Sequence, residues 1–185
     1  MTSRLASLLI LLATSVFPAT LEKLALDEMI VKSTEIVRGR VASVTSFRRG
    51  SLILTQVRLA VTERWKGADA PSVDIFLHGG TFQGLRQTFS GTPELREGAE
   101  YICFLWAGES GNRQIVGLSQ GVLDIQPATA ASKSGSAPQS LAAIRPAIAG
   151  MLDPITRAET ADAGFKFPLD DLRLRVKRVL DLERQ

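Results

Sequence analysis

The stretch that decides the fold is Leu52-Ile-Leu-Thr-Gln-Val-Arg-Leu-Ala-Val-Thr-Glu-Arg-Trp65. Successive side chains of a β-strand point to opposite faces, so its period of two predicts a long strand with one face buried. We expect so long a strand in a small domain to be bent or bulged. The mostly apolar set is Ile53, Thr55, Val57, Leu59, Val61 and Trp65, and the polar set is Gln56, Arg58, Thr62 and Arg64.

Further strand-like segments lie on both sides of this stretch, separated by turn signals rich in Gly, Ser, Asn and Pro. Short strands joined by turns, without helical segments between them, are typical of antiparallel β structure. The sequence therefore predicts a mainly β protein, either a small antiparallel barrel (OB-like) or a sandwich. The expected strands are Ile36–Val44, Val73–Leu77, Leu85–Phe89, Tyr101–Trp106, Gln114–Gly117 and Gly121–Ile125.

Helices are expected near both ends of the chain. Leu24–Ser33 has helical spacing, with Asp27 and Glu28 in its first turn, where carboxylates favour a helix. Pro168–Leu180 predicts a C-terminal amphipathic helix, for which we expect no membrane contact because its charges nearly cancel. Leu141–Leu152 is apolar but contains Pro146, which predicts a broken helix.

The first residues predict export from the cytoplasm. Arg4 precedes an apolar run from Leu5 to Phe17, which is the layout of a secretory signal peptide. Cleavage after Ala19 and cleavage after Ser15 both remain open, as does a retained anchor. The predicted location is secreted or periplasmic.

This signal peptide is the first of four expected parts of the chain. Residues 1–19 form the signal peptide, 20–126 the β-barrel domain with its leading helix, and 127–140 a flexible linker. Residues 141–185 form a C-terminal segment with the terminal helix. The linker assignment rests on the Ala, Ser, Gly and Pro content of that stretch.

Composition argues against several functional classes. The 22 Lys and Arg residues nearly balance 19 Asp and Glu, and aromatic residues make up only 6%. We therefore expect no nucleic-acid partner. The single cysteine, Cys103, lies in an apolar run and is expected to be a buried thiol.

The pattern Gly117-Leu-Ser119-Gln-Gly121 matches the G-x-S-x-G nucleophile elbow of serine hydrolases. In that fold the elbow joins a strand to a helix, and the catalytic histidine follows the serine. Here the only histidine, His78, precedes Ser119, and the residues after the motif are strand-like. Without a convincing catalytic constellation we expect no enzyme, and a turn between two strands is the favoured interpretation.

His78-Gly79-Gly80 and Arg86 are the candidate ligand-binding residues. A phosphate-binding Walker loop requires Lys and Ser or Thr before a helix, whereas Leu85 and Arg86 follow Gly84 here. The glycines are expected to supply positive φ or a close backbone crossing, and Arg86 could hold an anion beside exposed amides. His78 is expected at a strand end on the surface. Without a second His or a Cys pair we expect no metal and no cofactor.

Several segments together resemble a family of uncharacterised secreted bacterial proteins. The similarity covers about residues 24–126, through "LALDEMIVKSTEIVRGRV", "VTERWKG", "HGG", "SGTPELREGAEYICFLW" and "VGLSQGVLDI". A more distant likeness is to netrin-like domains and tissue inhibitors of metalloproteinases, which are OB-type barrels. The shared marks are Val37-x-Gly39-x-Val41, Lys66-Gly67, and Gly98-x-x-Tyr101-x-x-Phe104-Leu105. This likeness implies a barrel. It does not imply the inhibitors' mechanism. That mechanism uses a cysteine at the N-terminus to bind the target's zinc, and this chain has no cysteine there.

The expected function is therefore a non-enzymatic extracytoplasmic binding or interaction module for an unknown protein or ligand. A protease-directed inhibitor or accessory factor is one form of it, suggested only by the distant likeness. The alternative is a small secreted hydrolase that uses Ser119.

Overall fold

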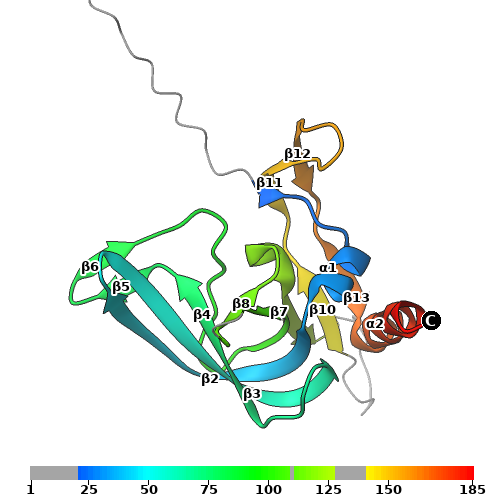
Figure 1. The fold of residues 1–185 in the computed structure, drawn as a ribbon, viewed down its shortest axis with the longest axis horizontal. Helices are drawn as coiled ribbons and strands as arrows, with labels where there is room; N and C mark the ends of the chain where they lie inside the picture. Colours follow the sequence, from blue (N-terminus) through cyan, green and yellow to red (C-terminus); the bar gives the residue numbers. More distant parts are fainter. Residues whose placement is uncertain (1–20, 109–110, 128–140) are drawn as a thin grey trace, which may run out of the picture.

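The computed structural model describes residues 21–108, 111–127 and 141–185. The expected signal peptide, and the expected linker from residue 128 on, lie outside these ranges. The protein is mainly β (Figure 1). Its helices are α1 (Leu26–Lys32), the 3₁₀ turn η1 (Leu118–Gly121) and α2 (Leu169–Glu183). Its strands are β1 (Leu21–Glu22), β2 (Glu35–Arg49), β3 (Leu52–Lys66), β4 (Ser72–His78), β5 (Gly80–Phe82), β6 (Leu85–Gln87), β7 (Glu100–Ala107), β8 (Arg113–Ile115), β9 (Val122–Pro127), β10 (Leu141–Arg145), β11 (Ile148–Leu152), β12 (Glu159–Asp162) and β13 (Phe165–Pro168).

The long β2–β3 hairpin organises the main sheet. Strand β3 confirms the predicted alternation, since Ile53, Val57 and Leu59 are buried. The pairing with β2 is interrupted by register shifts, one of them between Arg38 and Gly39. A side chain at Gly39 would clash with the Ala60 carbonyl oxygen, so the strands approach this closely only because this residue is glycine.

Five strands pair in a cycle. Strand β2 pairs with β3, β3 with β4, β4 with β8, β8 with β7, and β7 again with β2. The pairing of β4 with β8 is parallel, at Ile75 and Arg113. The sheet is therefore mixed, whereas the sequence predicted a wholly antiparallel one. Inside the cycle lies a core of aliphatic residues with Tyr101 and Cys103.

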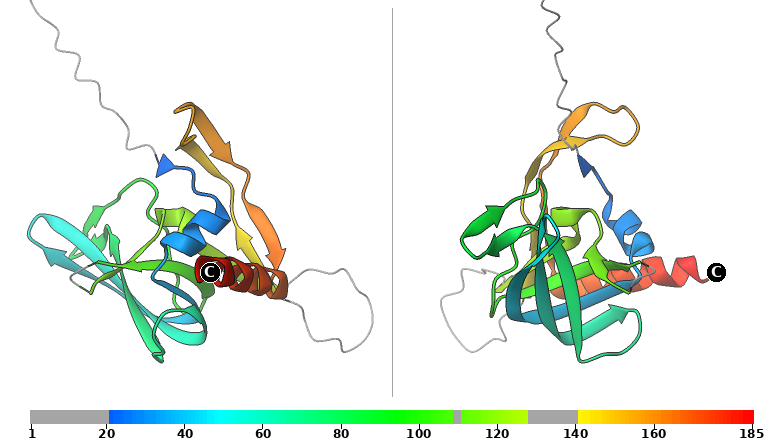
Figure 2. Two further views of the ribbon diagram at one scale, coloured as in Figure 1. Left: turned by 45° about the vertical axis from the view of Figure 1, so that its right-hand side comes forward. Right: turned by 60° about the vertical axis from the view of Figure 1, so that its left-hand side comes forward.

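The C-terminal segment extends the same sheet beyond β9 by adding β10 and β13 (Figure 2). The prediction of a broken helix over Leu141–Leu152 is wrong, because this segment forms β10 and β11 on either side of Pro146. The edge of β9 offers β10 a hydrogen-bonding partner, with Ala143 opposite Ile125. Pro146 lies between the two strands, where its missing N–H breaks no pairing.

Helix α2 confirms the predicted terminal helix and packs against α1, as both figures show. Its apolar stripe, Leu169, Leu172, Val176 and Leu180, is buried in a second core with Met29, Ile30 and Phe104. Ion pairs join α2 to the rest of the chain: Arg173 to Glu63 at 2.8 Å, Arg175 to Asp27 at 2.8 Å and Lys66 to Glu183 at 3.2 Å. Among the described residues, no helix is long and apolar enough to cross a bilayer.

Candidate functional site

The four predicted ligand-binding residues line one hollow at the end of β4. We call it the end hollow; its volume is about 320 Å³, and it includes His78, Gly79, Gly80 and Arg86. Its other walls come from β2, β3, β6 and the loop that leads to β7. Leu77, Val57 and Leu95, all buried or nearly so, give it an apolar lining.

Gly79 and Gly80 form the part of the end hollow's wall where β4 continues into the β5–β6 hairpin. Gly79 has φ 94° and Gly80 has φ 133°, values that side-chain-bearing residues rarely adopt. A Cβ at Gly80 would clash with Thr55 Oγ1 and Ser46 Oγ. These positions therefore require glycine for both backbone conformation and close approach, as the sequence predicted.

Hydrogen bonds fix this wall in place. The Gly79 N–H donates to the Ile53 carbonyl at 2.8 Å, and Thr55 Oγ1 donates to the Gly79 carbonyl at 2.6 Å. Ser46 Oγ lies 3.0 Å from Thr55 Oγ1. From the hairpin, Gln87 Oε1 accepts the Ile53 N–H at 2.7 Å. The hollow is thus bounded by backbone held from several directions, a preorganised surface.

The rim of the end hollow carries exposed charged and aromatic groups. Arg86 lies 3.8 Å from Glu94, and both side chains are more than two-thirds exposed (71% and 78%). Such a pair is loose, because solvent screens its attraction and holding the two side chains together costs conformational entropy. Arg96 adds a second guanidinium, and the His78 ring meets Phe89 edge-on with centroids 5.7 Å apart. The rim can accept an anionic group while the lining accepts an apolar one.

Ser119 lies in the η1 turn rather than at a strand-to-helix elbow. Gly117 and Leu118 have positive φ, and the chain continues directly into β9. The Ser119 N–H donates to the Gly91 carbonyl at 2.9 Å. Gly121 packs so closely on the Val116 carbonyl that any side chain there would clash. The motif's glycines therefore have a structural role, and Ser119 does not line the end hollow that contains His78.

The described residues include no group of three or more His, Cys, Asp or Glu side chains arranged to hold a metal ion. Cys103 is completely buried, and this burial raises the pKa of its thiol to about 12. The thiol is therefore protonated at neutral pH, a form with little nucleophilic or metal-binding character.

Two features of the structure were not predicted from the sequence. Gln120, inside the serine motif, is fully buried and binds the backbone of the N-terminal segment. A second depression lies on the outward face of β2, β3 and β4, lined by Phe47 and Phe76 among others. Alternation along β4 places Phe76 and His78 on one face. That Phe47 lies on the same face follows only from the register of the β2–β3 hairpin, which places Phe47 opposite Leu54.

Comparison with protein-family models, with curated proteins and with solved structures gives no match to this chain.

Proposed function

We propose that this protein is a non-enzymatic extracytoplasmic binding module that takes its ligand into the end hollow. The observation that carries the proposal is the meeting of His78, Gly79, Gly80 and Arg86 around one depression. These residues come from a strand end, a glycine turn and a hairpin. The apolar lining and the arginine rim complement a ligand with an apolar body and an anionic group.

The architecture supports a binding role. We propose that the five-strand cycle is an OB-like barrel with the end hollow at its mouth; support comes from the closed sequence of pairings among β2, β3, β4, β8 and β7. Small barrels commonly bind ligands at their mouths and connecting loops. Export is supported by the apolar run from Leu5 to Phe17.

A protease-directed inhibitor or accessory factor is one form of this proposal, supported by the distant netrin-like marks. Gly39 of Val37-x-Gly39-x-Val41 lies too close to the Ala60 carbonyl to carry a side chain, and Gly98 has φ 76°. Tyr101 is a further mark; its Oη accepts the Arg96 N–H at 3.2 Å, which orders the loop beside the end hollow.

The test is affinity capture on the immobilised mature chain from the extracytoplasmic fraction of its source. Arg86→Glu reverses the charge of the rim, and Arg178→Glu is the matched control on the exposed face of α2. We expect a defined species that wild type and Arg178→Glu retain at raised salt and that Arg86→Glu loses. Equal recovery by all three proteins, or only salt-labile material, would contradict the proposal.

A further inference from the structure

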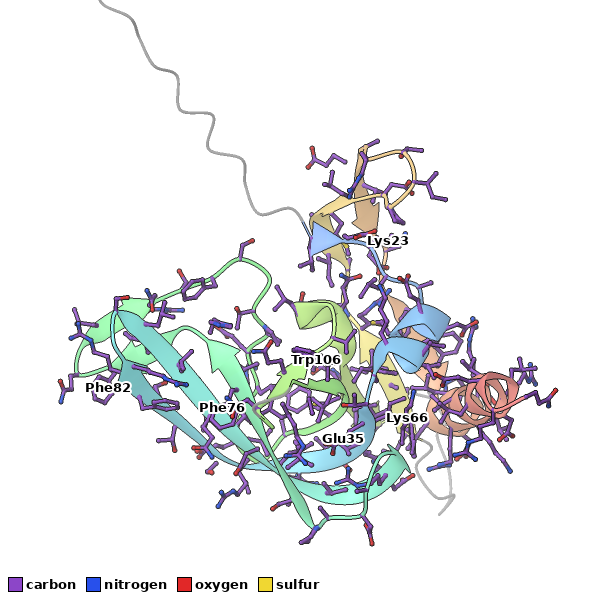
Figure 3. All side chains as sticks on the ribbon, viewed as in Figure 1. Lys23, Glu35, Lys66, Phe76, Phe82 and Trp106 are labelled. Atoms are coloured by element: carbon purple, nitrogen blue, oxygen red, sulfur yellow. The ribbon has the colours of Figure 1, made fainter. Side chains whose placement is uncertain are left out.

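A second depression lies on the outward face of the main sheet, on the far side of β4 from the barrel interior. We call it the outer groove; its volume is about 450 Å³. Its apolar wall is formed by Phe47, Leu52, Leu54 and Phe76. Figure 3 labels Phe76 on β4 and Phe82 at the β5–β6 hairpin.

The strand register creates the outer groove. Phe47 of β2 lies opposite Leu54 of β3, and Leu54 lies opposite His78 of β4, so these side chains share one face. The neighbouring residues Ile53 and Thr55 point the other way and are buried. The rings of Phe47 and Phe76 meet edge to face, with centroids 6.4 Å apart.

On β3 and β4, the large apolar residues of this face gather at the hairpin end. Farther along the same face, Arg58 and Asp74 form a two-bonded ion pair, the polar surface expected where a sheet meets water. Leu52, by contrast, is 39% exposed although it is large and apolar. Exposed apolar side chains that gather in a depression rimmed by polar residues are a candidate interaction site.

Among the described residues, the polar groups that line the outer groove are a guanidinium, an imidazole and two amides, without a carboxylate. Arg49 stands at one side and Asn112 and Gln114 at the other. Within the described residues, no ion pair or hydrogen bond holds the Arg49 guanidinium, whereas Arg48 donates to the Gly50 carbonyl at 2.8 Å. The complement of this surface is an apolar side chain next to a carboxylate.

We propose that the outer groove docks an extended acidic and apolar segment of a partner polypeptide. An aromatic or aliphatic side chain of the segment packs between Phe47 and Phe76, and a neighbouring carboxylate binds Arg49. A polypeptide fits better than a membrane, because the apolar residues line a depression rather than a protrusion. It fits better than a glycan, because the rings meet edge to face and present no flat stacking platform.

Docking here is separate from ligand binding in the end hollow, since the two surfaces share only His78. The test therefore leaves His78 unchanged. The probe is a fluorescein-labelled peptide, Gly-Asp-Phe-Asp-Leu-Asp-Gly, and the control peptide has Lys in place of each Asp. Binding is measured by fluorescence anisotropy, and the bound surface by amide chemical shifts of the full mature chain.

We expect the acidic peptide to bind wild type and to shift amides around Phe47, Arg49 and Phe76. Arg49→Glu, a surface change that leaves the cores intact, should weaken binding about tenfold or more, as for a central interface arginine. Phe76→Ala should weaken it to a similar degree, and Arg86→Glu should leave it unchanged. Because Arg86→Glu tests the end hollow alone, failure of either proposal is distinguishable from failure of the other.

Three outcomes would overturn the docking proposal. One is equal binding of the acidic and basic peptides, or shifts outside the outer groove. Another is binding to phosphatidylglycerol vesicles that Arg49→Glu abolishes, while the peptide does not bind; this would assign the groove to a lipid surface. The third is concentration-dependent self-association lost in Arg49→Glu, which would assign it to a second copy of this chain.

Discussion

The side-chain amide of Gln120 holds the backbone of Leu24, a residue far away in the sequence. Gln120 Oε1 accepts the Leu24 N–H at 2.8 Å, and Gln120 Nε2 donates to the Glu22 carbonyl at 2.8 Å. The amide is wholly buried, and both of its bonds are to backbone. A motif that matches a hydrolase signature therefore contains the residue that fastens the start of the described chain to the sheet.

Replacement of Gln120 by Ala should lower the free energy of unfolding by about 2 to 4 kcal/mol. It leaves the buried Leu24 N–H unpaired, at about 1 to 3 kcal/mol, and removes the partly buried bond to the Glu22 carbonyl, at about 0.5 to 1.5 kcal/mol. The neighbouring change Ser119→Ala should cost less than about 0.5 kcal/mol. Urea denaturation of both variants checks this, and equal costs would contradict the role of the amide.

Ser119 should not react with a fluorophosphonate probe. It lies in a 3₁₀ turn whose backbone is bonded to Gly91, outside the hollow that contains the only histidine. Labelling of the intact protein is measured by mass spectrometry, with trypsin as the positive control. Covalent labelling of wild type that disappears in Ser119→Ala would support the hydrolase alternative instead.

Gly80→Ala should destabilise the protein more than Gly84→Ala. Both glycines have positive φ, but a Cβ at Gly84 meets open space, while one at Gly80 meets the hydroxyls of Thr55 and Ser46. Strain alone should cost about 1 kcal/mol at Gly84, and strain plus overpacking about 3 kcal/mol or more at Gly80. Comparison of the melting temperatures of the two variants separates backbone strain from overpacking. Equal shifts in melting temperature would mean that Thr55 and Ser46 move aside at little cost.

Arg145 and Asp162 form a buried ion pair, with side chains only 5% and 6% exposed. Arg145 also stacks on Phe165, 4.4 Å from the ring centroid, and desolvation lowers the pKa of Arg145 although Asp162 opposes this. Arg145→Ala leaves the buried Asp162 carboxylate with only the Gly164 N–H as a partner and no compensating charge, and should cost about 3 to 5 kcal/mol.

The matched control is Arg175→Ala, whose ion pair with Asp27 is about half exposed. It should cost less than about 1 kcal/mol. Chemical denaturation of the two variants measures both losses of unfolding free energy. A cost for Arg145→Ala as small as that for Arg175→Ala would show that water reaches Asp162.

Cys103 should make stability depend on alkaline pH. Burial raises its pKa to about 12 in the folded protein, against about 8.5 in an unfolded chain. The folded state therefore holds this proton more tightly, and the stability it contributes is complete below about pH 8.5 and lost as the pH rises towards 12. Cys103→Ala should show a shallower loss over that range. Rapid reaction of the native thiol with Ellman's reagent at pH 8 would contradict its burial.

Local patterns were sufficient for the elements whose side chains alternate strongly. Strand β3 and helix α2 appear where their periods of two and of 3.6 residues predict them, because these periods follow from backbone geometry alone. The segment around Pro146 was mispredicted because an apolar run is compatible with helix or strand until a partner is present. The β9 edge is that partner, and it is supplied by a distant part of the chain.

The candidate sites divide in the same way. His78, Gly79, Gly80 and Arg86 could be selected from the sequence because a histidine at a strand end and paired glycines have local meaning. The outer groove could not, because Phe47 and Phe76 come from strands separated by β3 and meet only once the register is set. The role of Gln120 was hidden for a similar reason, since its partners belong to the N-terminal segment.

By itself, then, the sequence determined the mainly β class, the two flanking helices and the glycines that the turns require. These depend on side-chain period and on backbone freedom at single residues. The tertiary structure alone decided the cycle of strand pairings, the parallel contact of β4 with β8 and the addition of β10 and β13 to the sheet. It also decided which side chains surround each depression. Pairing energy depends on which distant edges and faces meet, and that is a property of the whole folded chain.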